Sequence, residues 1–222
     1  MPSFATSPEI VARHLLLEGV RRLVPDERVV SAMRNVPREL FVRREDRLLA
    51  YANRALTAEG GGAVPEPLVV ARVLSAASIT ASDRVLVTGG DGGYVAAVVA
   101  RLARDVTLVE PDEGQRAELL RRLGSLGARP CVVTGPPLEG WEEQAPFDAI
   151  VVTTPQADMP PALVAQLNLG GRLAVPMHDA DGEMLARVVR EGIGRLRLDR
   201  LGDVRGTRTP SWPPLHRAGS AP

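Results

Sequence analysis

The sequence predicts an α/β protein with a doubly wound, Rossmann-like sheet. From residue 83 onward, strand-like apolar runs alternate with helix-like segments. Runs of this kind, in which apolar residues do not alternate with polar ones, are typical of parallel strands buried on both faces. A glycine-rich stretch, GGDGG, follows the first run, where such sheets bind ligands. The five predicted strands are 84–88, 106–110, 130–134, 147–153 and 170–176.

The segments between and after these runs complete the predicted sheet. Apolar residues recur at helical spacing in 94–103, 115–127 and 162–167. Two further runs, 183–191 and 195–203, flank a tight turn that contains Gly192 and Gly194. We therefore predict an antiparallel C-terminal hairpin at the edge of the sheet.

The first third of the chain predicts a helical N-terminal extension. Leucines and valines recur at helical spacing before residue 37, and Pro25 with Asp26 opens the second helix. Another helix is predicted through 68–77. Between them, the stretch 57–67 contains three glycines and two prolines, which argues against both a helix and a strand ladder. We expect one domain over residues 1–222, with an extension (1–80), a core (83–204) and a tail (205–222).

Composition excludes several classes of site. The 222 residues carry 27 basic and 27 acidic side chains, and this balance does not favour nucleic acid as a partner. None of the basic residues is lysine, so a P-loop and a Tyr-x-x-x-Lys dehydrogenase site are both excluded. Cys131 is the single cysteine and the three histidines lie far apart in sequence, which predicts no metal site. We expect a cytoplasmic protein without a membrane span, as a monomer or small homo-oligomer.

The glycine loop and an acidic residue predict a nucleotide-like ligand. The loop Gly89-Gly90-Asp91-Gly92-Gly93 follows the first strand and opens a helix, where backbone can approach a negative group closely. Glu110 ends the second strand, 110 − 89 = 21 residues further on, at the place where an acid holds ribose hydroxyls. An adenosine-type ligand is the better interpretation. A mere tight turn is the simpler alternative, and a nicotinamide cofactor is disfavoured because no Tyr–Lys pair exists.

At these residues the chain resembles the protein-L-isoaspartate O-methyltransferases, which use S-adenosylmethionine. The resemblance runs in the family's order over roughly residues 10–200. It is carried by VPRELFV (36–42), AYANRAL (50–56), VLVTGGDGGYVAAVVARLA (85–103), VTLVE (106–110), APFDAIVVT (145–153) and PPALVAQLNLGGRLAVP (160–176). It implies a seven-stranded methyltransferase sheet, and methylation of a protein or peptide carboxylate at isoaspartyl residues.

The resemblance also implies a cofactor loop, in which this chain departs from the family pattern Val-Leu-Glu-Ile-Gly-x-Gly-Ser-Gly-Tyr. Val87 stands at the family's glutamate, Asp91 at its middle glycine and Gly92 at its serine. The family's aspartate that meets adenine after the third strand is replaced by Pro136. The expected cofactor-binding residues are Gly89, Asp91, Gly92, Gly93 and Glu110.

The implied substrate loop departs as well. Pro65 stands at the family's serine and Ala63 at its threonine, so two hydroxyls that would orient a carboxylate are absent. Glu66 adds a negative charge that would repel an acidic substrate. The expected substrate-binding residues are Val64, Pro65, Glu66 and Thr153.

Two hypotheses remain open from the sequence. The first is a divergent S-adenosylmethionine-dependent methyltransferase acting on a protein or peptide. The second is a catalytically inactive relative that uses the fold to bind a partner, motivated by Val87, Pro65 and Pro136.

Overall fold

Strand β3 (Arg84–Thr88) lies inside a seven-stranded sheet in the computed structural model, which describes residues 8–88, 90–179 and 182–205. The strand order is β5-β4-β3-β6-β7-β8-β9. Strands β3 to β7 run parallel, and β8 and β9 are antiparallel to their neighbours. The other strands are β4 (Asp105–Glu110), β5 (Cys131–Thr134), β6 (Phe147–Val152), β7 (Leu167–Asp179), β8 (Gly182–Gly192) and β9 (Arg195–Asp203). The predicted doubly wound sheet with its C-terminal hairpin is confirmed.

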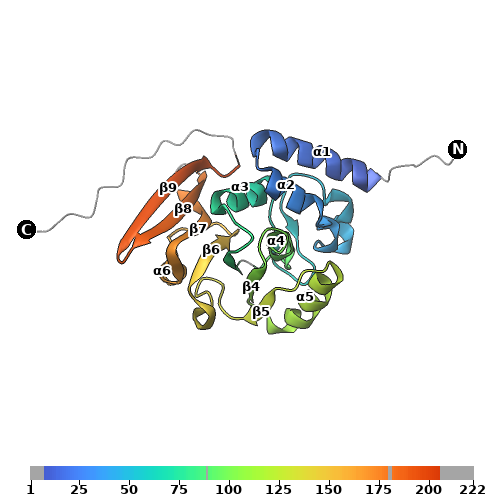
Figure 1. Ribbon diagram of the computed structural model, residues 1–222. Helices are drawn as coiled ribbons and strands as arrows, with labels where there is room; N and C mark the ends of the chain where they lie inside the picture. The colour runs from blue at the N-terminus through green and yellow to red at the C-terminus, as the bar shows by residue number, and fades with distance from the viewer. Residues whose placement is uncertain (1–7, 89, 180–181, 206–222) are drawn as a thin grey trace, which may run out of the picture.

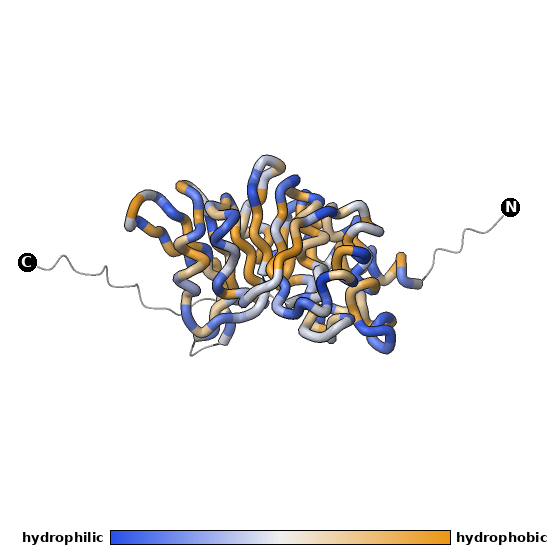
Figure 2. The backbone as a smooth tube through the Cα atoms, turned by 90° about the horizontal axis from the view of Figure 1, so that it is seen from below, coloured by the Kyte–Doolittle hydropathy of each residue, from blue (hydrophilic) through white to orange (hydrophobic). Residues whose placement is uncertain are grey.

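The central strands are apolar because both of their faces are covered. Val85 and Val87 contribute to one hydrophobic cluster, while Leu86 between them contributes to another on the opposite face. Successive side chains of a strand point to opposite faces, so an all-apolar run fits a strand buried on both. Figure 2 shows these hydrophobic strands side by side in the middle of the molecule.

Helices α3 and α4 pack on the sheet, and the N-terminal helices pack on them (Figure 1). α2 contacts both α3 and α4, and α1 packs on α2. α5 packs along β4 and β5, and α6 packs against β7. The helices are α1 (Pro8–Leu23), α2 (Glu27–Arg34), α3 (Pro67–Ala77), α4 (Tyr94–Val99), α5 (Glu113–Ser125) and α6 (Pro161–Ala165), with short 3₁₀ turns at Arg38–Leu40, Arg44–Leu49 and Glu142–Gln144.

Two helix starts follow directly from the sequence. Asp26 accepts hydrogen bonds from the amides of Arg28 and Val29 at the start of α2, as the Pro25-Asp26 signal predicts. Asp112 accepts one from the amide of Gly114 at the start of α5. These carboxylates satisfy amides that have no partner inside the helix.

The expectation that 57–67 forms no strand ladder is wrong. β1 (Leu56–Thr57) pairs antiparallel with β2 (Ala63–Val64), and the three glycines make the turn between them. All three have positive φ, at 95°, 108° and 75° for Gly60, Gly61 and Gly62. Glycine therefore permits this hairpin rather than blocking it, because its backbone reaches a region that L side chains rarely adopt.

Within the three described ranges, no helix combines the length and apolar character needed to cross a bilayer. Of the predicted tail, only Arg205 falls among the described residues. The division into an extension, a core and a tail stays a prediction.

Candidate active site

Two cavities meet at the carboxyl ends of the parallel strands. The first has a volume of about 360 Å³ and the second about 380 Å³, each large enough for a small ligand. Gly62 of the glycine turn and Gly90 of the loop after β3 line both. Ligands in the two cavities would therefore approach each other at these two glycines.

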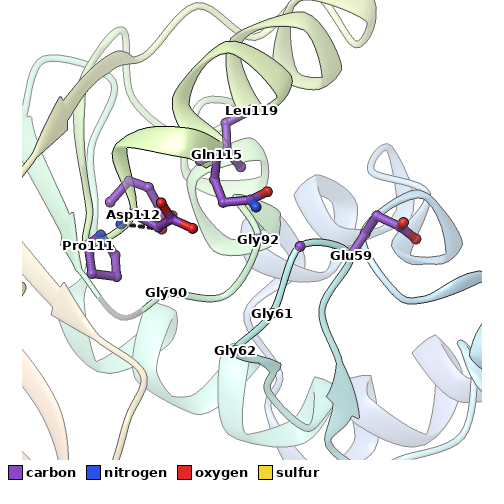
Figure 3. A pocket seen from close by; sticks show the side chains of 11 residues that line it. Glu59, Gly61, Gly62, Gly90, Gly92, Pro111, Asp112, Gln115 and Leu119 are labelled. Atoms are coloured by element: carbon purple, nitrogen blue, oxygen red, sulfur yellow. Dashed lines mark hydrogen bonds between the residues drawn. The ribbon is translucent and has the colours of Figure 1, made fainter.

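The first cavity lies between the glycine turn, the loop after β3 and the start of α5 (Figure 3). Gln115 extends from α5 toward the glycine turn, where a Cβ on Gly60 would come 2.1 Å from Gln115 Oε1. The backbone of the turn thus passes directly over this amide. The lining residues are Glu59, Gly60, Gly61, Gly62, Gly90, Gly92, Glu110, Pro111, Asp112, Gln115 and Leu119.

Glu110 contributes a half-satisfied carboxylate to the first cavity. It ends β4, is only 5% exposed, and its Oε1 accepts a hydrogen bond of 3.1 Å from the amide of Asp112. Its Oε2 takes part in no hydrogen bond among the residues that the structure describes. Burial raises the pKa of Glu110 above its ordinary value, because the charged form loses hydration. Hydroxyl donors of a bound ligand would compensate for that loss.

Asp91 turns away from both cavities. Its Oδ1 accepts from the amide of Gly93 at 2.9 Å, and its Oδ2 accepts from the amide of Val95 at 3.1 Å. The carboxylate therefore satisfies the N-terminal amides of α4 rather than facing a ligand. Burial raises the pKa of Asp91 to about 6, with the nearby charge of Glu110 adding to the shift.

Two buried hydroxyls lie at the same end of the sheet without a hydrogen-bond partner among the described residues. They are Oγ1 of Thr88, at the end of β3, and Oγ1 of Thr134, at the end of β5. Thr134 is paired with Glu110 across β4 and β5. Buried polar groups are nearly always hydrogen-bonded in folded proteins, so these two hydroxyls are consistent with a ligand or bound water nearby.

The second cavity lies on the other side of Gly62 and Gly90. Its only charged residues, within the part of the chain that the structure describes, are Glu66, Glu183 and Arg205. Glu66 precedes α3, whereas Glu183 and Arg205 come from the start of β8 and the residues after β9. The lining residues are Ala55, Gly62, Ala63, Pro65, Glu66, Val69, Gly90, Thr153, Thr154, Pro155, Glu183 and Arg205.

A buried arginine holds the wall of the second cavity in place. Arg38 is 1% exposed, and its Nη2 donates to the carbonyl oxygens of Val64 and Pro65 at 3.3 and 3.0 Å. The same guanidinium donates to the carbonyls of Ala50 and Arg54 at 2.6 and 2.9 Å. Burial lowers the pKa of Arg38 from its ordinary value. One side chain thus ties together the segment 50–65.

The structure brings together some of the expected site residues. In the first cavity it places Gly92 and Glu110, and in the second Pro65, Glu66 and Thr153. Gly93 contributes its amide to Asp91 instead, and Gly89 lies outside the described residues. Val64 is fully buried and offers its carbonyl to Arg38 rather than a surface to the cavity.

The residues behind the inactive alternative occupy three different places. Val87 is 1% exposed and belongs to the hydrophobic core, and neither Val87 nor Pro136 lines either of these two cavities. Of the three, only Pro65 lies at the site.

Sequence reasoning missed several lining residues. Gln115 lies five positions after Glu110 on the following helix, and this spacing is a signal that could have found it. Glu183 and Arg205 gave no such signal, because only the fold of the hairpin brings them to the cavity.

Similarity to known proteins agrees with this arrangement. The family model for protein-L-isoaspartate(D-aspartate) O-methyltransferase matches residues 13–206. The chain belongs to this family. A protein-L-isoaspartate O-methyltransferase 2 from Pelobacter propionicus is 39% identical over 198 residues, covering 88% of this chain and 86% of the relative. A family member from Methanoculleus marisnigri is 40% identical over 186 residues, covering 82% and 83%. These similarities give no support to the inactive alternative.

Solved structures of the family share the fold. A protein-L-isoaspartate O-methyltransferase with 24% identity aligns with a TM-score of 0.69, over 80% of this chain and 60% of its own length. A Plasmodium falciparum structure in complex with S-adenosyl-L-homocysteine aligns with a TM-score of 0.70 at 20% identity. That alignment covers 85% of this chain and 93% of the other. The topology of the family is therefore retained over most of the chain.

Proposed function

We propose that this protein transfers a methyl group from S-adenosylmethionine to the side-chain carboxylate of an isoaspartyl residue in a protein or peptide. The observation that supports it most strongly is the meeting of two ligand-sized cavities at Gly62 and Gly90, in a chain of this family. One cavity would hold the cofactor and the other the methyl acceptor.

The first cavity fits the cofactor in three respects. Five glycines from the glycine turn and the loop after β3 line it, so that backbone rather than side chains faces the ligand. Glu110 offers ribose hydroxyls its Oε2, which has no hydrogen bond to any residue that the structure describes. The hydroxyls of Thr88 and Thr134, which have no hydrogen-bond partner within the described ranges, lie at the same end of the sheet.

In the proposed site, Gly90, Gly92 and Glu110 hold the cofactor, with Gln115 as an added ligand. Gly93 shapes the loop, and Asp91 acts indirectly by fixing its exit into α4. Gly89 stays a predicted cofactor-binding residue that lies outside the described residues. When bound, S-adenosylmethionine supplies an electrophilic methyl group on its sulfonium. The acceptor carboxylate is ionised at neutral pH, so this chain need not provide a catalytic base.

The second cavity would position the acceptor without the family's two hydroxyls. Arg205 is the one cation among its described lining residues, and it can pair with the acceptor carboxylate. Thr153 and the backbone around Pro65, held by Arg38, complete the wall. Binding and orientation, rather than proton transfer, are the tasks of these residues.

Two measurements test the proposal. Titration calorimetry with S-adenosylhomocysteine should give a dissociation constant in the micromolar range, about −8 kcal/mol. Incubation of an isoaspartyl peptide with methyl-labelled cofactor should give a base-labile methyl ester, whereas the matched aspartyl peptide should not. No heat at millimolar ligand, together with no ester, would favour the inactive alternative instead.

A further inference from the structure

Arg205 lies between two carboxylates in the second cavity. Its Nε is 3.4 Å from Oε1 of Glu66, and its Nη2 is 3.3 Å from Oε1 of Glu183. The carboxylate side chains are only 20% and 16% exposed, while that of Arg205 is 51% exposed. We call these three residues the acidic triad.

The backbone keeps the triad assembled. The amide of Arg205 donates to Oδ1 of Asp203 at 2.7 Å, which closes a turn directly after β9. Val204 is fully buried, and its amide donates to the carbonyl of Glu183 at 3.2 Å. The segment that carries Arg205 is therefore fastened to the strand that carries Glu183.

The triad leaves the second cavity with a net negative charge. Its described lining residues carry two acids and one base, and the base is already shared between the acids. An acceptor carboxylate that pairs with Arg205 would weaken those two pairs. With the acceptor bound, the cavity holds more negative than positive charge. The charges lie close enough to one another for Coulomb interactions to be appreciable.

We propose that Glu66 and Glu183 select substrates in which a lysine or arginine lies next to the methyl-accepting carboxylate. This inference rests on the proposed function for the location of the acceptor. The substrate cation takes over pairing with the two glutamates, while Arg205 pairs with the acceptor carboxylate. Substrates with an acidic neighbour are rejected, because they would place a third negative charge beside the glutamates.

The test is peptide binding measured by fluorescence anisotropy with S-adenosylhomocysteine present, which does not depend on turnover. Three labelled isoaspartyl peptides differ only in the residue after the isoaspartate, which is lysine, glutamine or glutamate. The wild-type protein should bind the lysine peptide about tenfold more tightly than the glutamate peptide. The preference should shrink as salt is raised, because the pairs are partly exposed.

Variants identify the source of the preference. In the double variant Glu66→Gln and Glu183→Gln, Arg205 is released, so the preference should reverse toward the glutamate peptide. The matched control Glu45→Gln changes an exposed glutamate that lines neither cavity, and it should keep the wild-type ratio. The ratio of two affinities is insensitive to a partial loss of folded protein.

The outcomes separate the two proposals. Equal binding of the three peptides by the wild type, or an unchanged ratio in the double variant, would overturn the role of the triad while leaving methyl transfer intact. A lysine preference that depends on the glutamates, without any methyl ester formed, would support the triad and contradict the proposed function.

Discussion

Gly62 lies directly against the carbonyl oxygen of Gly90, where a Cβ on Gly62 would come within 2.1 Å of that oxygen. Substituting Gly62 by alanine should therefore displace the loop after β3. We expect cofactor affinity to fall at least tenfold, and the free energy of unfolding to fall by roughly 2–4 kcal/mol, from the clash together with the positive φ.

Gly127 provides the matched control for this prediction. It also has a positive φ, but it lines neither cavity and a Cβ there would meet nothing within 4 Å. Gly127→Ala should therefore cost only the backbone strain, about 1–2 kcal/mol, and leave cofactor affinity nearly unchanged. Calorimetry with S-adenosylhomocysteine and urea unfolding measure both quantities. Equal losses of affinity in the two variants would mean that the contact between Gly62 and Gly90 does not shape the site.

Glu110 should contribute measurably to cofactor binding. Replacing it by alanine removes the carboxylate that lies in the first cavity, and we expect a loss of about 1–3 kcal/mol in binding free energy. Glu113→Ala is a suitable control, because Glu113 begins α5 just after Glu110 in the sequence and lines neither cavity. If Glu110 contacts only the ribose, the affinity for adenine alone should be unchanged in both variants. Unchanged affinity for S-adenosylhomocysteine in Glu110→Ala would refute the ribose assignment.

The sequence predicts the sheet well, because its signal is local. The apolar run of β3 and the acidic residue at the end of β4 can each be recognised from a few consecutive residues. The acidic triad forms only because β8 and β9 return to the start of α3. No local sequence pattern encodes that return, so the triad could not be predicted. The role of Asp91 is decided by the hydrogen bonds that it accepts from the amides of Gly93 and Val95 at the start of α4, and the composition of the loop does not reveal them.

The raised pKa of Asp91 makes a prediction about stability and pH. The pKa rises from 3.8 to about 6 on folding, so the folded state favours the protonated form. The stabilisation from this group is fully present below about pH 4 and is lost as the pH rises through 6. At neutral pH, the loss reaches roughly 2–3 kcal/mol, at 1.36 kcal/mol per pKa unit.

Comparison with Asp91→Asn isolates this contribution, because the other titrating groups are common to both proteins. The asparagine has one acceptor oxygen in place of the two that serve Gly93 and Val95, so the variant should be less stable. Its deficit should be larger at pH 4.5 than at pH 7.5 in urea unfolding. A deficit that stays constant across this range would show that Asp91 titrates normally in the folded protein.

Arg38 should be the most sensitive of these positions for stability. Its guanidinium donates to four carbonyl oxygens of the segment 50–65, and the side chain is almost fully buried. Arg38→Met fills a similar volume but leaves those carbonyls without their donor, and we expect the free energy of unfolding to fall by more than about 3 kcal/mol. Arg47→Met, at an exposed arginine nearby, should change it by less than about 0.5 kcal/mol. Urea unfolding compares the two variants, and backbone hydrogen exchange over the segment 50–65 should accelerate in Arg38→Met alone. Similar exchange in both would mean that the hairpin of β1 and β2 holds its shape without the arginine, and that the wall of the second cavity depends on other contacts.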